Sequence, residues 1–131
     1  MKSLIVLFVA ASILYVSAVI MPQSVVASSP QHIGAQAFAS CRACHTLQAN
    51  GKSMMGPNLH KLFGRKAGTV SGYNYSPALK ASGIVWDAKS LDQFLTSPTA
   101  NVPGTRMVVK LADPAKRAAL IAYLRAETSK R

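Results

Sequence analysis

The only two cysteines of the chain, Cys41 and Cys44, lie three positions apart, and His45 follows the second directly. Three kinds of chemistry use thiols and an imidazole this close together. A redox-active disulfide is expected beside a strand–helix unit of a parallel sheet. A zinc site needs four ligands, and the chain adds only His32 and His60 to these three side chains. Covalent haem attachment uses the string Cys-x-x-Cys-His as it stands.

Haem attachment accounts for the whole motif. Residues three apart on a helix share a face, so two thiols could bond to one edge of a porphyrin while His45 faces its iron. We therefore predict one haem c, bound covalently through two thioethers, with His45 as an axial ligand. A structural disulfide is the main alternative, but it leaves the adjacent histidine unexplained.

The second axial position of such an iron has several candidate ligands in the chain. They are His32, His60, Met54, Met55 and Met107. Met107 follows a Pro-Gly turn that can present a side chain inward, whereas the other two methionines are closer to His45 in sequence. Spacing alone leaves the choice open, because an isolated methionine often only fills a core.

The first 27 residues differ from the rest of the chain. Lys2 precedes an apolar run over residues 4–20, and Val25 and Ala27 occupy the small-residue positions of a cleavage site. We predict a signal peptide over residues 1–27 and one domain over residues 28–131, exported to the periplasm. An uncleaved membrane anchor is the alternative, since the apolar run over residues 4–20 just reaches the lower end of the range of about 17 to 25 residues that a membrane-spanning helix needs.

The charge of the chain is strongly basic, with 15 Lys and Arg against 4 acidic residues. This balance favours association with acidic surfaces. The basic residues are scattered, without the continuous run that is typical of a nucleic-acid-binding tail. We therefore expect acidic protein partners and no nucleic acid.

Turn and cap signals predict helices at both ends of the domain and loops between them. The expected helices cover residues 33–43, a short segment after Ser76-Pro77 to residue 81, a segment capped by Ser90 and stopped by Pro98, and a last helix from Asp113-Pro114 to about residue 128. Glycines and prolines over residues 48–72 predict a long loop.

No stretch of the sequence alternates between apolar and polar residues with period two, so the predicted fold class is all-α. A loop content this high in a small domain favours a large apolar cofactor at its centre.

From Gly34 to Leu124 the chain resembles the class I cytochromes c, the single-haem electron carriers of mitochondria and bacteria. The resemblance rests on "GAQAF", "CRACHT", "GPNLHKLFGR", "GYNYSPAL", "IVW", "PGTRM" and "LIAYL". It implies a small cytochrome c fold in which the first and last helices pack together, near Gly34 and Phe38, and loops wrap around one covalent haem.

The same resemblance implies a role for each site residue. Cys41 and Cys44 would hold the haem, His45 and Met107 would be its axial ligands, and the Pro57 carbonyl would accept a hydrogen bond from the ligand imidazole. The residues that would hydrogen-bond or neutralise a haem propionate are Arg65, Tyr75 and Trp86. The chain departs from many relatives after the ligand methionine, where Val109 replaces an aromatic residue and a glycine is missing.

These features predict a soluble, monomeric one-electron carrier rather than an enzyme. It would shuttle electrons between membrane respiratory or photosynthetic complexes, docking on acidic surfaces of a cytochrome bc-type reductase, a terminal oxidase or a reaction centre. Its membrane contact would be transient unless the leader is retained. The basic residues expected around the haem edge are Arg42, Lys52, Arg106 and Lys110. The alternatives are a haem peroxidase-like enzyme with an open sixth coordination site and a haem-free exported module stapled by a disulfide.

Overall fold

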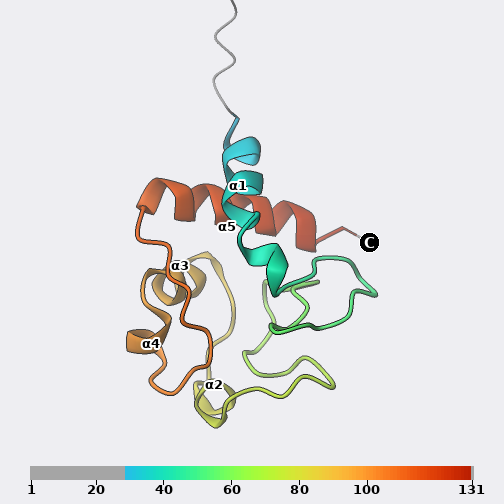
Figure 1. The fold of residues 1–131 in the computed structure, drawn as a ribbon, viewed down its shortest axis with the longest axis vertical. Helices are drawn as coiled ribbons and strands as arrows, with labels where there is room; N and C mark the ends of the chain where they lie inside the picture. The colour runs from blue at the N-terminus through green and yellow to red at the C-terminus, as the bar shows by residue number, and fades with distance from the viewer. Residues whose placement is uncertain (1–28, 131) are drawn as a thin grey trace, which may run out of the picture.

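The computed structural model describes residues 29–130, which form helices joined by long loops (Figure 1). Along the chain these are α1 (Pro30–Phe38), the 3₁₀ turn η1 (Cys41–Ala43), α2 (Pro77–Ala81), α3 (Ala88–Thr96), α4 (Pro98–Asn101) and α5 (Pro114–Thr128). The one extended pairing among the described residues is an isolated antiparallel bridge between Lys66 and Val85. The predicted all-α class is confirmed. The predicted signal peptide lies outside the described residues.

Helices α1 and α5 cross at close range, as Figure 1 shows. A Cβ atom at Gly34 would lie 2.3 Å from the Ala119 carbonyl oxygen and 2.5 Å from the Tyr123 Cβ, so only glycine fits at this crossing. The Phe38 and Tyr123 rings pack with centroids 5.8 Å apart. The predicted packing of the first helix on the last is confirmed, and it fixes where the chain enters the cysteine motif.

The first helix is shorter than predicted and begins earlier. It starts at Pro30, whose missing N–H is no loss at a first helical position, and the Ser29 hydroxyl accepts a hydrogen bond from the His32 N–H. It ends at Phe38 rather than continuing to residue 43. The Ser40 hydroxyl donates to the Ala37 carbonyl at 3.3 Å, which takes up a carbonyl at the end of the helix. The cysteines therefore lie on a separate 3₁₀ turn.

The cap of α3 also differs from the prediction. Asp87, not Ser90, is the N-cap: its carboxylate accepts from the Ser90 N–H at 2.7 Å, and the Ser90 hydroxyl accepts from the Asp87 N–H at 2.9 Å. The hydrogen bond from the Ser90 backbone lowers the pKa of Asp87. This reciprocal capping starts the helix at Ala88, and Pro98 then ends it and opens α4.

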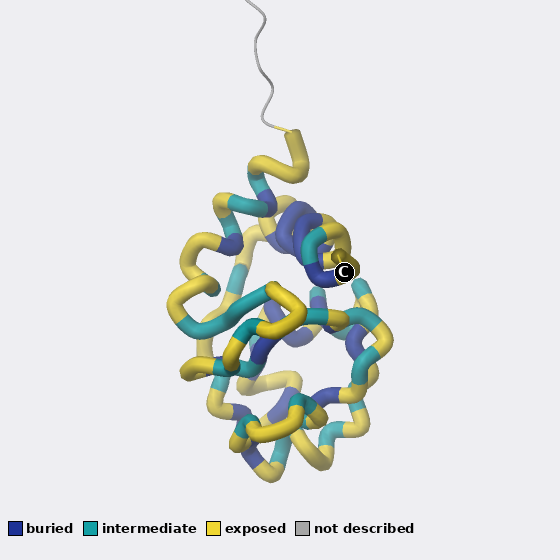
Figure 2. Tube along the Cα trace, turned by 90° about the vertical axis from the view of Figure 1, so that its right-hand side faces the viewer, coloured by how far each residue is buried: buried dark blue, intermediate teal, exposed yellow. Residues whose placement is uncertain are grey.

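The remaining helices follow their sequence signals. Ser76 caps α2 and Asp113 caps α5, each with proline in the first helical turn. No helix within residues 29–130 is long and apolar enough to cross a bilayer. Buried residues gather in α5 and recur at intervals along the surrounding loops, between intermediate and exposed stretches (Figure 2).

Candidate functional site

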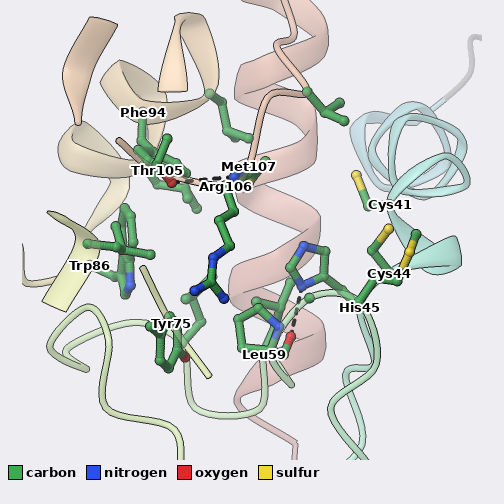
Figure 3. Close-up of a pocket in the computed structure, with 18 of the residues that line it drawn as sticks. Cys41, Cys44, His45, Leu59, Tyr75, Trp86, Phe94, Thr105, Arg106 and Met107 are labelled. Carbon is green, nitrogen blue, oxygen red and sulfur yellow. Dashed lines mark hydrogen bonds between the residues drawn. The ribbon is translucent and has the colours of Figure 1, made fainter. Parts of the chain in front are cut away.

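A mostly apolar cavity of about 450 Å³ lies between the helices and the loops. Its lining includes every residue that the sequence predicts for the site: Cys41, Cys44, His45, Pro57, Arg65, Tyr75, Trp86 and Met107. Figure 3 shows the cysteines and His45 on one side of the cavity, with Trp86 and Tyr75 on the other. The volume lies in the range of about 300 to 1,000 Å³ that is typical of cofactor sites.

The two cysteines lie at the start and at the C-terminal cap of the η1 turn. A 3₁₀ helix has three residues per turn, so side chains at i and i+3 stand one above the other, and Cys41 and Cys44 reach the same side. Both thiols are free and half-buried. Burial is the largest influence on the pKa of the Cys41 thiol and raises it. The pair thus presents two sulfur atoms along one edge of the cavity.

His45 is held in one orientation by the loop that faces it. Its Nδ1 lies 2.8 Å from the Pro57 carbonyl oxygen, and because a carbonyl can only accept, Nδ1 carries a proton, which leaves Nε2 as the nitrogen with a lone pair in the neutral ring. Burial lowers the pKa of His45, which favours the neutral imidazole. A neutral imidazole whose second nitrogen is fixed by a hydrogen bond is the form that binds metals.

Gly56 allows the loop to pass directly over this imidazole. A Cβ atom at this position would lie 2.3 Å from the His45 Cε1 and 2.7 Å from its Nδ1 and Nε2. The Gly56 N–H also donates to the Cys44 carbonyl at 2.9 Å. Glycine is therefore required here by space. The Gly-Pro dipeptide signals a turn in the sequence, but its contact with the histidine could not be derived from it.

Asn58 organises the same loop from within. Its side-chain amide donates to the Thr46 hydroxyl at 2.8 Å and to the Gln48 carbonyl at 2.9 Å, and its side-chain oxygen accepts from the His60 N–H at 2.8 Å. Its backbone N–H donates to the Ser53 hydroxyl at 3.1 Å. Asn58 is 8% exposed, so these hydrogen bonds lie away from water. The sequence around Asn58 indicates only a loop.

Arg65, Tyr75 and Trp86 also line the cavity. The Arg65 guanidinium donates to the carbonyls of His60 at 2.7 Å and Asn58 at 3.0 Å, and burial lowers its pKa. Tyr75 is buried, and burial raises the pKa of its hydroxyl. The Trp86 ring packs edge-on against a phenylalanine of α3, with centroids 5.2 Å apart. The three provide one cation and two rigid aromatic walls.

Met107 reaches the cavity from the segment that precedes α5. It is half-buried, and its N–H lies 3.4 Å from the hydroxyl of Thr105, at the long end of hydrogen bonding. Gly104 adopts φ +88°, the left-handed conformation that the predicted Pro-Gly turn requires. The turn therefore delivers the methionine side chain inward.

The other candidates for a second ligand are placed less favourably. His32, His60 and Met54 are absent from the cavity lining. Met55 is part of the lining but 77% exposed, and it directly precedes Gly56, so it belongs to the loop that covers His45. Met107 is the one candidate that approaches the cavity from a separate segment.

The donor set of the cavity fits a haem better than it fits the alternatives. Two thiols on one edge, an imidazole, a thioether, a guanidinium and an apolar lining are all groups that can hold a haem c. Residues 29–130 contain no group of three or more His, Cys, Asp or Glu side chains that could hold a metal ion. They also lack the parallel sheet expected beside a redox-active disulfide.

Comparison with known proteins agrees with this geometry. The family model "Cytochrome c" matches residues 32–127. The chain belongs to the cytochrome c family. It is similar to cytochrome c of Guizotia abyssinica, with 46% identity over 90 residues that cover 68% of this chain and 81% of the relative. It is also similar to cytochrome c2 of Rhodomicrobium vannielii, with 46% identity over 92 residues that cover 70% and 74% of the two chains.

Among solved structures, cytochrome cH from Methylobacterium extorquens superposes with a TM-score of 0.65 at 46% identity, covering 72% of this chain and 95% of the other. The predicted cytochrome c fold is confirmed. As a member of this family, the protein is an electron carrier rather than an enzyme, and its cofactor is a covalently bound haem c.

Two long-range hydrogen bonds near the cavity mouth were not anticipated from the sequence of this cytochrome c. The Tyr73 hydroxyl donates to the Met55 carbonyl at 2.5 Å, and the Arg106 guanidinium donates to the Asn74 carbonyl at 2.6 Å. They join the loop around residue 74 to the segments on either side of the cavity. Local sequence patterns cannot predict such contacts, because the two residues of each hydrogen bond are 18 and 32 positions apart in the chain.

Proposed function

We propose that this cytochrome c carries one electron at a time on a haem fastened by Cys41 and Cys44, with His45 and Met107 as its axial ligands. The observation that carries the proposal is the His45 imidazole, which the Pro57 carbonyl fixes at the cavity that Met107 also lines. A histidine–methionine pair raises the reduction potential and fills both axial positions, which favours electron transfer over the binding of small molecules.

Arg65, Tyr75 and Trp86 would receive a haem propionate. A guanidinium is a strong partner for a carboxylate, and its own hydrogen bonds to two backbone carbonyls hold Arg65 in place. Tyr75 and Trp86 are both buried beside the same cavity, where a hydroxyl and an indole N–H could donate. These residues orient the cofactor and offset its negative charge.

The partners would be membrane redox complexes with acidic docking surfaces, such as a cytochrome bc-type reductase, a terminal oxidase or a reaction centre. Arg42, Lys52, Arg106 and Lys110 are all exposed, and the chain carries a net charge of +11. Such a charge accelerates encounters with acidic surfaces and does so less at high salt. Val108 and Val109, 71% and 60% exposed, add an apolar strip to the mouth of the cavity.

The protein would act in the periplasm as a soluble monomer. Residues 1–27 have the composition of a signal peptide, and cleavage after Ala27 would release the domain over residues 28–131. Retention of the leader as an anchor would keep the domain at the membrane surface. Bacterial cytochrome c2 among the relatives supports an exported carrier.

Intact mass after export, in cells that carry the haem-attachment machinery, tests cofactor attachment and leader removal together. The expected mass is that of residues 28–131 plus one haem. A colourless protein would contradict the proposal and favour the disulfide-stapled module. Ferric protein that is high-spin and binds cyanide or azide readily would favour the peroxidase-like enzyme, because the sixth position would then be open.

A further inference from the structure

Arg117 is a buried arginine on the first turns of α5, only 8% exposed. It lies three, four and seven positions before Leu120, Ile121 and Leu124, so it belongs to the apolar face of the helix. A charge on such a face needs partners, since an unpaired buried charge is strongly destabilising. The hydrogen-bond partners of Arg117 belong to α3 and to the segment that precedes α5.

The Arg117 guanidinium binds both α3 and the segment that leads back from Met107. Its Nε donates to the Asp92 carboxylate of α3 at 2.8 Å, and its Nη1 donates to the carbonyls of Leu111 at 2.9 Å and Ala112 at 2.8 Å. The Leu111 N–H donates in turn to the Leu95 carbonyl of α3 at 2.8 Å. Leu111 and Ala112 are therefore fixed to α3 and α5 at once.

The chain between Met107 and this fixed point is poorly supported. Backbone groups of residues 108–110 make no hydrogen bond to any described residue, and all three residues are exposed. The Met107 N–H has only its long contact with Thr105. The nearest strong anchors on the C-terminal side of Met107 are therefore at Leu111 and Ala112, where the Leu111 N–H binds α3 and both carbonyls accept from Arg117.

We infer that Arg117 is a positioning residue for Met107, because it fixes the end of the unsupported segment and so holds the sulfur at the cavity. The inference rests on the proposed ligation of the haem iron by Met107. Lysine could not replace this arginine fully. An ammonium lacks the planar fork that donates to a carboxylate and to two carbonyls from fixed directions.

The test compares imidazole binding to the ferric haem of the wild-type holoprotein and its variants, together with the weak far-red absorption band that reports a methionine sulfur on ferric iron. Arg117→Gln should bind imidazole about tenfold more tightly and weaken the band, because the segment that holds Met107 is released. Arg117→Lys should change affinity by only about threefold, since one charged contact can re-form.

Two controls separate positioning from general instability. Lys116→Gln removes the same charge from an exposed neighbour on the same helix and should leave imidazole affinity unchanged. Tyr123→Leu weakens the α1–α5 crossing at a side chain outside the cavity lining, so it should lower the midpoint of unfolding without changing imidazole affinity.

The inference is overturned if Arg117→Gln binds imidazole as weakly as Lys116→Gln, or if Tyr123→Leu tightens binding by as much. If Arg117→Gln yields no holoprotein, Asp92→Asn tests the same contact, and a wild-type affinity in both Asp92→Asn and Arg117→Lys overturns it. Absence of the far-red band from the wild-type protein would instead contradict the proposed Met107 ligand.

Discussion

The two sides of the haem cavity are built in different ways. The proximal loop, residues 44–60, carries His45 and is tied to itself by hydrogen bonds through buried Asn58 and by the close passage of Gly56. In the distal segment, residues 105–111, the Met107 N–H has one long contact, Val108 and Val109 are exposed, and the hydrogen bonds to distant segments are made by Arg106 and Leu111. The proposed ligand His45 is held locally, whereas the proposed ligand Met107 depends on distant anchors.

This difference would suit the separate tasks of the two ligands that we propose. A rigid imidazole next to the attachment cysteines would orient the cofactor. A methionine on a less supported segment would raise the reduction potential and exclude other ligands. Changes to the proximal loop should therefore affect assembly and global stability, whereas changes to the distal segment should affect ligand exchange and potential.

Gly56→Ala should have the largest effect on stability. Its methyl group would overlap the His45 ring, and relief requires movement of the loop or the ligand, so we expect a loss of about 3 kcal/mol in the free energy of unfolding. Denaturant unfolding of the holoprotein measures it. Gly72→Ala is the control: it has positive φ but open space, and should cost about 1 kcal/mol. Equal losses would contradict the steric account.

Asn58→Ala should be the next most damaging change. It removes the side-chain hydrogen bonds to Thr46 and Gln48 and leaves the His60 N–H without its partner, for an expected loss of about 2 kcal/mol. Asn50→Ala, at an exposed position of the same loop, should change stability by less than about 0.5 kcal/mol. A comparable loss in both variants would mean that the loop is not organised by Asn58.

Thr105→Val is the distal counterpart and should cost less than about 1 kcal/mol, because its contact with the Met107 N–H is long. The two segments can then be compared in a single series of unfolding curves. If Thr105→Val destabilises the protein as much as Asn58→Ala, the distal segment is as tightly held as the proximal loop and the contrast fails.

Asp87→Ala should give the smallest effect, and one that depends on pH. Hydrogen bonds from Ser90 lower the pKa of the Asp87 carboxyl in the folded protein, so the ionised form adds stability above the unfolded pKa of about 3.9, and this contribution is lost as the pH falls through the lower folded pKa. The difference in unfolding midpoint between wild type and Asp87→Ala should therefore shrink in acid. A pH-independent difference would show that only the neutral cap matters.

Local signals in the sequence predicted a large part of this structure. Asp113-Pro114 and Ser76-Pro77 start helices because a cap and a fixed φ act within one turn, and Cys-x-x-Cys-His defines an attachment site within five residues. The predicted end of α1 and the predicted cap of α3 were wrong. Short side chains such as those of Ser40 and Ser90 can hydrogen-bond to more than one nearby backbone group, so their position in the sequence does not fix which one they bind.

The residues that support the site could not be predicted in the same way. Gly56 matters through the ring of a histidine eleven positions earlier, and Arg117 through carbonyls and a carboxylate on other segments. The sequence does contain one signal for Arg117, because it is a lone arginine in the apolar stripe of the last helix. Such an exception marks a buried charge, but only the folded structure identifies its partners.

The reduction potential of Met107→Ala tests most directly whether Met107 completes the site formed by Cys41, Cys44 and His45. We expect the covalent haem to stay attached while the potential falls by on the order of 0.1 V, a fraction of the range of about 0.8 V that axial ligands span. An unchanged potential, or loss of the covalent haem in this variant, would contradict the assignment of the two axial ligands.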